Sequence, residues 1–296
     1  MYGRVTGVTV VGVRGYVVAV EAHIGRGLPS LTLTGLPGAP VQDARDRIRP
    51  AVESAGLEWP LRRVVVNLSP GNLRKEGAGL DLPVAMGVLA ASAQVPAERL
   101  NGFAFTGELS LKGTLVSTPG VLSVAMAAAR AGLEGLVVPI DNASEAALVQ
   151  GLRVIPAPSL AEVVGFFRGT WSPPGRPAET RSDLGPGHDV DFSEVRGQAQ
   201  ARRALEVAAA GGHNVLLVGS PGAGKTMLAR RLATILPAMT RQEALEVTQL
   251  HSVAGLLDGG GLLRERPFRS PHHSVSLPAL LGGGSAFLRP GEVSLA

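Results

Sequence analysis

Hydrophobic and polar residues in the first half of the chain follow two different periods. Runs rich in valine and other β-branched residues predict strands at about residues 5–20, 31–35, 63–68, 136–139 and 153–156. Alanine-rich runs with helical spacing predict helices at residues 81–93 and 121–131, and a third at residues 42–55 that Pro50 is expected to break or kink. This mixture of elements predicts an α+β domain.

A helix start followed by a change in composition marks the end of this domain. Ser159 and Glu162 have the spacing of a capping box. The helix after them carries four apolar residues that close the domain, Val163, Val164, Phe166 and Phe167. Residues 169–188 then alternate proline, glycine and polar residues, which is typical of a linker. We therefore predict a first domain at residues 1–168, this linker, and a second domain at residues 189–296.

The second domain opens with a pattern that changes from helix to strand to helix. A helix is predicted at about residues 198–210, followed by a glycine pair and a short apolar strand at residues 214–218. Another helix is predicted from residue 224 to about residue 236, where Pro237 stops it. The segment between strand and helix is glycine-rich, which is the context of a phosphate-binding loop.

The residues of this loop match the pattern GxxxxGK[ST]: Gly219, Ser220, Pro221, Gly222, Ala223, Gly224, Lys225 and Thr226. Glycines let successive backbone N–H groups point at phosphate oxygens, and the helix N-terminus adds a partial positive charge. Lys225 is predicted to reach the β- and γ-phosphates of ATP, and the Thr226 hydroxyl to ligate Mg²⁺. A chance glycine-rich turn is the alternative, and the flanking elements favour nucleotide binding.

Composition narrows the class of protein only slightly. The chain has no cysteine, which excludes disulfides, thiolate metal sites and cysteine nucleophiles and agrees with a cytoplasmic location. A net charge of +4 permits nucleic-acid binding without requiring it. No apolar run is long enough for a membrane span, so we expect no membrane partner.

Several segments around the loop resemble a known family. Residues 192–206 are similar to the segment that lies over the adenine in AAA+ ATPases, and residues 251–255 and 266–274 closely resemble segments of the magnesium-chelatase-like YifB/ComM family. This resemblance covers nearly the whole chain and implies a partial α/β P-loop AAA+ domain that works as a homo-oligomeric ring. His272 and His273 are interpreted as structural, since neighbours in one strand point to opposite faces. His251 is interpreted as a satisfied histidine at a helix end.

The first domain resembles the Lon-type proteolytic domain, which implies a ribosomal-protein-S5-domain-2-like fold. The resemblance rests on residues 75–79 and 106–113. Lon proteases use a serine–lysine dyad, but Gly79 stands at the serine position and Leu122, or a near neighbour, at the lysine position. Five serines and lysines remain for a rearranged dyad, Ser69, Ser117, Ser123, Lys75 and Lys112. We expect a binding or assembly module and no protease.

The family's acidic Walker B strand is expected just beyond Ala296, and we interpret the chain as C-terminally truncated. The carboxylates after Thr226 are Glu243, Glu246, Asp258, Glu265 and Glu292, and none follows an apolar strand. The resemblance also implies that residues 282–290 begin a hairpin that faces the ring's pore. Without Walker B and an arginine finger, we expect this chain to bind ATP with Mg²⁺ but to hydrolyse it poorly.

Four functions remain open. The resemblance favours a DNA branch-migration motor of natural transformation, and four arginines offer modest support as a phosphate-binding cluster, Arg264, Arg266, Arg269 and Arg289. A solvated basic surface explains these arginines equally well. The other functions are the ATPase subunit of a magnesium chelatase, an ATP-dependent Lon-like protease, and a scaffold that senses nucleotide.

Overall fold

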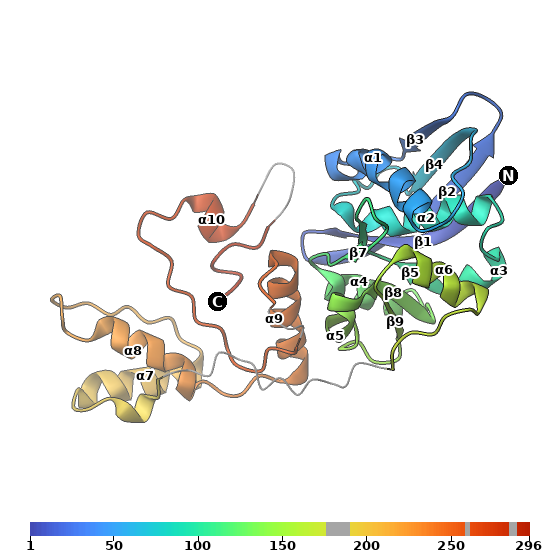
Figure 1. Cartoon of the computed structure of the whole chain (residues 1–296). Helices are drawn as coiled ribbons and strands as arrows, with labels where there is room; N and C mark the ends of the chain where they lie inside the picture. The colour runs from blue at the N-terminus through green and yellow to red at the C-terminus, as the bar shows by residue number, and fades with distance from the viewer. Residues whose placement is uncertain (176–189, 258–260, 284–288) are drawn as a thin grey trace.

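A computed structural model describes residues 1–175, 190–257, 261–283 and 289–296. Its first part is built on a seven-stranded sheet in the order β3-β4-β2-β1-β5-β8-β9, and β6 and β7 form a separate ribbon (Figure 1). The strands are β1 Tyr2–Val11, β2 Arg14–Gly25, β3 Ser30–Thr34, β4 Arg63–Ser69, β5 Phe103–Phe105, β6 Glu108–Leu109, β7 Leu115–Val116, β8 Gly135–Pro139 and β9 Arg153–Ala157.

The sheet is mixed and mostly parallel. β1 pairs with β2, and β2 with β4, in antiparallel register, while β3–β4, β1–β5, β5–β8 and β8–β9 are parallel. The β1–β2 hairpin turns at Gly12, whose φ of 59° lies in the left-handed region that glycine tolerates without strain. The β-rich segment predicted at residues 5–20 is therefore a hairpin of two strands.

The helices and short 3₁₀ turns complete the chain. The α-helices are α1 Ala39–Ser54, α2 Asp81–Ala91, α3 Ala97–Leu100, α4 Val121–Arg130, α5 Ala143–Ala146, α6 Leu160–Arg168, α7 Ala199–Gly211, α8 Lys225–Leu232, α9 Arg241–Ala254 and α10 Leu277–Leu281. The 3₁₀ turns are η1 Ala78–Leu80, η2 Ile140–Asn142, η3 Phe192–Glu194 and η4 Ala233–Ile235. No helix in these described ranges has both the length and the apolar character needed to cross a bilayer.

Burial along the strands explains how the layers form. In β2 buried and partly exposed residues alternate, because only one face of the sheet is covered there, whereas every residue of β5 and β8 is buried. One core joins the sheet to α1, α2 and α6, and a second core on the opposite face joins it to α4 and α5. The parallel half of the sheet is thus sandwiched between two helical layers.

Most predicted elements of the first part are confirmed, with two differences. The strand β5 is not predicted, because its three consecutive apolar residues show neither the alternation of a half-buried strand nor the spacing of a helix. The predicted break at Pro50 is wrong: α1 continues through this residue to Ser54, with Val41, Ile48 and Val52 buried along one face. Packing of this face outweighs the loss of one backbone hydrogen bond at the proline.

The α6 helix begins as its sequence indicates. Ser159 is its N-cap, and the Ser159 side chain accepts a hydrogen bond from the Ala161 backbone N–H. Glu162 contacts the Ser159 hydroxyl, where a full capping box would bond the Ser159 backbone N–H. Phe167 on this helix packs edge-on against Phe103, so α6 closes the core as expected. Residues 169–175 follow it without regular structure, and the rest of the predicted linker lies outside the described residues.

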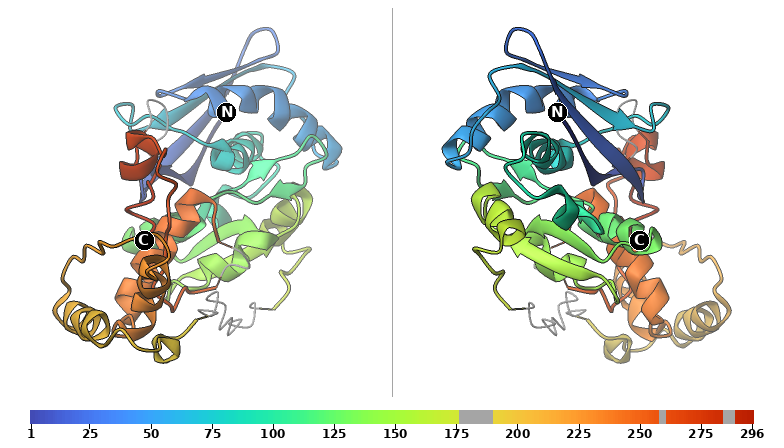
Figure 2. Two further views of the ribbon diagram at one scale, coloured as in Figure 1. Left: turned by 90° about the vertical axis from the view of Figure 1, so that its left-hand side faces the viewer. Right: turned by 90° about the vertical axis from the view of Figure 1, so that its right-hand side faces the viewer.

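The regular elements that the structure describes in the second part of the chain are helices joined by irregular segments. Between residues 190 and 296, described residues form no strand beyond one isolated bridge between Gly283 and Arg289. α7 and α8 lie side by side away from the sheet, whereas α9 lies against the first part (Figures 1 and 2). The chain therefore returns to the first part after the P-loop.

Candidate nucleotide-binding site

The P-loop and the start of α8 adopt the geometry that the sequence predicts. Gly222 and Gly224 have φ angles of 80° and 83°, in the left-handed region that strains any other L-residue. α8 then begins at Lys225, with Gly224 as its N-cap and no side chain capping its first N–H groups. These orphan N–H groups and the helix dipole make the N-terminus of α8 suited to an anion.

Lys225 lies across the loop that precedes it. Its Nζ donates to the carbonyl oxygens of Gly219 and Ser220, at 2.8 Å each. Both acceptors are neutral and the contacts are on the surface, so a phosphate can replace them as the partner of the ammonium group. Thr226 is exposed on the first turn of α8, where its hydroxyl is free to approach a hydrated cation.

A small core positions the loop against the segment before it. Phe192, Val195, Leu205 and Leu228 are buried together, and Arg231 of α8 is paired with Glu194 at 2.5 Å. The Arg231 hydrogen bond lowers the pKa of the Glu194 carboxyl from its usual value. Gln198 Nε2 donates to the Ala223 carbonyl at 3.3 Å, so the segment that resembles the adenine-covering region touches the loop.

The predicted strand at residues 214–218 is not formed. These residues are extended, but no described strand pairs with them, and the side chains of Leu216 and Val218 are 86% and 85% exposed. A β-strand is stable only when its backbone groups bond to a neighbouring strand. The expected strand–loop–helix context is therefore present only in its loop and helix.

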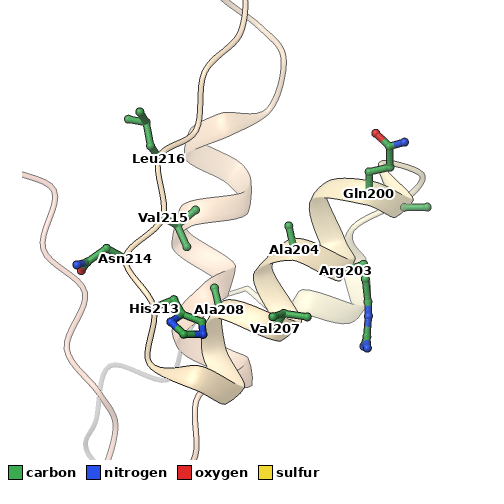
Figure 3. A pocket seen from close by; sticks show the side chains of 10 residues that line it. Gln200, Arg203, Ala204, Val207, Ala208, His213, Asn214, Val215 and Leu216 are labelled. Atoms are coloured by element: carbon green, nitrogen blue, oxygen red, sulfur yellow. The ribbon is translucent and has the colours of Figure 1, made fainter.

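The unpaired segment and α7 enclose a shallow apolar hollow of about 790 Å³ (Figure 3). Figure 3 shows Val215 facing Ala204 and Ala208 of α7, with His213 at the lower end. Val207 on the same helix is 49% exposed. Apolar side chains that a folded domain normally covers are thus on the surface next to the P-loop.

Three of the carboxylates that follow Thr226 are engaged elsewhere, whereas a buried Glu265 side-chain oxygen has no hydrogen-bond partner among the described residues. Glu243 forms a full capping box with Thr240 at the start of α9 and also contacts Arg266 at 3.4 Å. Glu292 accepts two hydrogen bonds from Arg269, at 2.6 and 2.7 Å, and Glu246 accepts one from Gln242. Asp258 lies outside the described residues. No hydrogen bond joins these side chains to the P-loop within the described ranges.

The four predicted arginines have different surroundings. Arg266 and Arg269 are held by the carboxylates just described, Arg264 is exposed, and Arg289 lines a separate cavity beside β1. Arg289 also closes the bridge with Gly283 at the ends of the predicted hairpin; residues 284–288 between them lie outside the described residues.

Three histidines that the sequence singles out, His251, His272 and His273, have protein neighbours in the structure. His251 is buried near the end of α9, where its Nδ1 lies 3.0 Å from the Val247 carbonyl, as expected for a satisfied histidine. His272 and His273 are not in a strand; their rings stack 4.1 Å apart beside a turn, so the expectation of opposite faces is wrong. No group of three or more potential metal ligands occurs in the described part of the chain.

The position that resembles the Lon serine faces two hydroxyls. A Cβ placed on Gly79 would lie 3.0 Å from Thr106 Oγ1 and 3.9 Å from Thr118 Oγ1. Leu122, at the lysine position, is fully buried in the first turn of α4. Among the described residues no hydrogen bond joins a serine side chain to a lysine side chain. The Lys75 Nζ instead donates to the carbonyls of Gly35 and Pro70.

Two buried ionisable groups lie near Gly79 in the sequence, Lys75, which the sequence singles out, and Asp81, which it does not. Asp81 accepts two hydrogen bonds from Arg47, at 2.9 and 3.1 Å, and one from the Leu109 N–H. Burial raises the pKa of Asp81 to about 6 despite these bonds. Burial likewise lowers the pKa of Lys75, which contacts no carboxylate among the described residues. Arg47 is 34 positions from Asp81, so local patterns carry no signal for the pair.

A polar network joins α9 to the first part of the chain. Glu145 accepts hydrogen bonds from the Leu122 N–H at 2.7 Å and from the Ser252 hydroxyl of α9. The Gly120 N–H donates to the Ser252 carbonyl, and Gln249 donates to Ser123 Oγ at 2.9 Å. Burial raises the pKa of the Glu145 carboxyl. The helix that follows the P-loop region is therefore fixed to the first part through buried polar groups.

Two family models match this chain. A model described as magnesium chelatase, subunit ChlI, matches residues 191–296, and one described as subunit ChlI of Mg-chelatase matches residues 20–142. The chain is also 28% identical over 195 residues to the Lon protease of Geobacter metallireducens, which covers 60% of this chain and 24% of that protein. Sequence similarity to magnesium chelatase thus extends over both parts of the chain. The chain also shares sequence similarity with a Lon protease.

Longer relatives match nearly the whole chain. It is 44% identical over 285 residues to protein YifB of Escherichia coli and 42% identical over 288 residues to competence protein ComM of Haemophilus influenzae. Each alignment covers 96% of this chain but 56% of the relative, so the chain spans little more than half the length of these proteins. With its P-loop and both chelatase matches, the chain belongs to the YifB/ComM family of magnesium-chelatase-like proteins.

Proposed function

We propose that residues 219–226 bind ATP together with Mg²⁺. The observation that carries this proposal is the glycine-shaped loop at the uncapped N-terminus of α8, with Lys225 held only by neutral carbonyls. In this assignment the loop N–H groups and Lys225 hold the phosphates, and the Thr226 hydroxyl ligates Mg²⁺. The contact between Gln198 and Ala223 supports a role for the preceding segment in covering the nucleotide.

Binding of a fluorescent ATP analogue tests this site. We expect saturable, Mg²⁺-dependent binding, which Lys225→Ala weakens by about 10- to 100-fold, because it removes charged hydrogen bonds worth about 1.5–3 kcal/mol. Arg230→Ala is the matched control, since Arg230 lies on the same helix and is exposed. Equal affinity of Lys225→Ala and the unaltered chain would contradict the assignment.

We further propose that this chain turns ATP over poorly. Glu243, Glu246 and Glu292 are engaged by other side chains, so none is placed to organise the magnesium shell or an attacking water. Phosphate release measured under saturating Mg²⁺ and ATP is expected to stay near background. Robust hydrolysis that Lys225→Ala abolishes would refute this part of the proposal and leave ATP binding intact.

We also propose a domain type for each part of the chain. Residues 1–168 form a Lon-protease-like domain of the ribosomal-protein-S5-domain-2-like kind, residues 169–188 a linker, and residues 189–296 a partial AAA+ domain. The sandwich of β5 and β8 between two helical layers and the match to a Lon protease support the first assignment. The P-loop and the chelatase match over residues 191–296 support the last. The cytoplasmic location stays a prediction.

In its longer relatives, we propose that this architecture works as a ring-shaped DNA motor. Support comes from the relative named competence protein and from exposed Arg264. Salt-dependent binding of the full-length relative to forked or single-stranded DNA tests the proposal, because phosphate contacts release counterions. Absence of binding at low salt would refute it. A chelatase ATPase subunit is the alternative that the family models favour, and stimulation of magnesium insertion into a porphyrin would support it.

A further inference from the structure

A cavity of about 640 Å³ lies beside β1, between the first part of the chain and the end of α9. Its volume falls within the range of ligand pockets in proteins. β1, the segment before α2, and residues 253–255 after the buried part of α9 all line it. The cavity is separate from the P-loop, because no residue of the loop lines it.

The cavity runs along an open backbone edge of β1. On one side β1 pairs with β2 over its whole length, but on the other side it pairs with β5 only at Thr6 and Gly7. After Phe105 the chain bends away, and the Gly107 N–H bonds to the Gly79 carbonyl. Residues 8–11 of β1 therefore have no strand on this side within the described residues.

The residues that line the cavity confirm that it faces the edge. Successive side chains of a strand point to opposite faces of a sheet. Val8 and Val10 point to one face and Thr9 and Val11 to the other, yet all four line the same cavity. This lining is consistent with a cavity that borders the free edge of β1. Exposure rises from 2% at Val8 to partial exposure at Val10 and Val11, so the inner end is closed.

The two walls differ in chemistry. On the face of α4 the cavity is lined by valines, including Val10, Val124 and Val253. The rest of the lining includes small and hydroxyl-bearing residues, among them Gly79 and Thr106, together with the charged residues Arg74, Glu76 and Glu108. A strand lying here would place alternate side chains against an apolar wall and against a narrow polar wall.

We propose that this cavity binds an extended polypeptide segment of a partner protein, which pairs with the open edge of β1. The segment continues the β1–β5 ladder in place of the strand that ends at Phe105. Four edge residues span about 13 Å at about 3.3 Å per residue. The two walls select small apolar side chains at alternate positions, with Ser, Thr or Ala between them. At Gly79 even a Cβ would lie 3.0 Å from Thr106 Oγ1, so a larger side chain there would crowd the polar wall.

Fluorescence anisotropy with short labelled peptides tests this proposal. The probes are a set of acetylated hexapeptides of the pattern Val-Thr-Val-Ser-Val-Ala, with Ala, Ile or Leu exchanged for Val. Each has a partner with the same side chains but N-methyl groups on alternate amides, which cannot donate to β1. We expect at least one peptide to bind saturably and to lose at least tenfold in affinity on N-methylation. Bound peptide is expected to slow hydrogen exchange at residues 8–11.

A variant locates the binding at the cavity. Gly79→Leu fills the polar wall and is expected to weaken peptide binding at least tenfold, while Gly71→Leu, whose Cβ meets open space, leaves it unchanged. Lys225→Ala is expected to bind peptide normally, so this result is independent of the nucleotide proposal. If no peptide binds up to millimolar concentration, or if N-methylated peptides bind equally well to the unaltered chain, the proposal is wrong.

Discussion

The raised pKa of the buried Asp81 carboxyl gives a quantitative prediction for the pH dependence of stability. The Asp81 side chain is 1% exposed at the start of α2, and it accepts hydrogen bonds from Arg47 and from the Leu109 N–H. Replacement of Asp81 by Asn keeps the shape and removes the titratable group. Burial, opposed by Arg47, raises the pKa of this carboxyl from 3.8 to about 6. The variant therefore isolates one pH-dependent contribution to folding.

The sign and size of that contribution follow from proton linkage. Between 3.8 and about 6 the folded chain keeps a proton that the unfolded chain has released, so the stability contributed by Asp81 falls as pH rises. The difference between the two pKa values of Asp81 corresponds to about 3 kcal/mol of stability. About 2 kcal/mol of this stability is lost between about pH 4.5 and about pH 7.5. The free energy of unfolding of Asp81→Asn, minus that of the unaltered chain, should rise by this amount over the same range.

Urea unfolding followed by tryptophan fluorescence measures this difference directly. The only tryptophans, Trp59 and Trp171, both pack on the core of the first part, so the signal reports on the domain that contains Asp81. Asp46→Asn, an exposed acid on α1, is the control and should show no such pH dependence. A difference that stays constant with pH, or that falls as pH rises, would refute the assignment of a raised pKa to Asp81.

Three further predictions concern other buried or functional groups. Ser252→Ala removes a hydrogen bond to the buried Glu145 carboxylate, worth about 1.5–3 kcal/mol, and should speed proteolysis just after α9. Burial lowers the Lys75 pKa below 10.5, so the unaltered chain should gain stability as pH rises from the folded pKa toward 10.5. In Lys75→Met this rise in the free energy of unfolding at alkaline pH should be absent, as urea unfolding at several pH values would measure. Thr226→Val should abolish the Mg²⁺ dependence of ATP-analogue binding, whereas Thr226→Ser should retain it; equal Mg²⁺ dependence of both would exclude Thr226 as a ligand.

The predictions that succeeded depend on local patterns. Alternation of buried and exposed residues locates β2, and alanine-rich spacing locates α4, because one element alone produces each pattern. Local patterns cannot reveal that Glu145 accepts a hydrogen bond from Ser252, because 107 positions separate the two residues.

The strand predicted at residues 214–218 failed for a different reason. Its apolar, β-branched composition is typical of a strand buried between helical layers, but a strand also needs neighbours that supply backbone partners. None of the described strands lies beside it, and Leu216 stays 86% exposed. In contrast, β8 has an equally apolar sequence and is fully buried, because β5 and β9 flank it. Composition specifies the preference, and the neighbours decide whether it is realised.

The α9 helix links the segment after the P-loop helix to the first part of the chain. Its first turn is capped by Thr240 and Glu243, and its last turns are fixed to the first part by Gln249 and Ser252. Fourteen helical residues span about 21 Å and bend little. Residues 236–240, between η4 and α9, have no helical hydrogen bonding. Residues 236–240 and α9 therefore form one route by which a change in the position of α8 can reach Glu145.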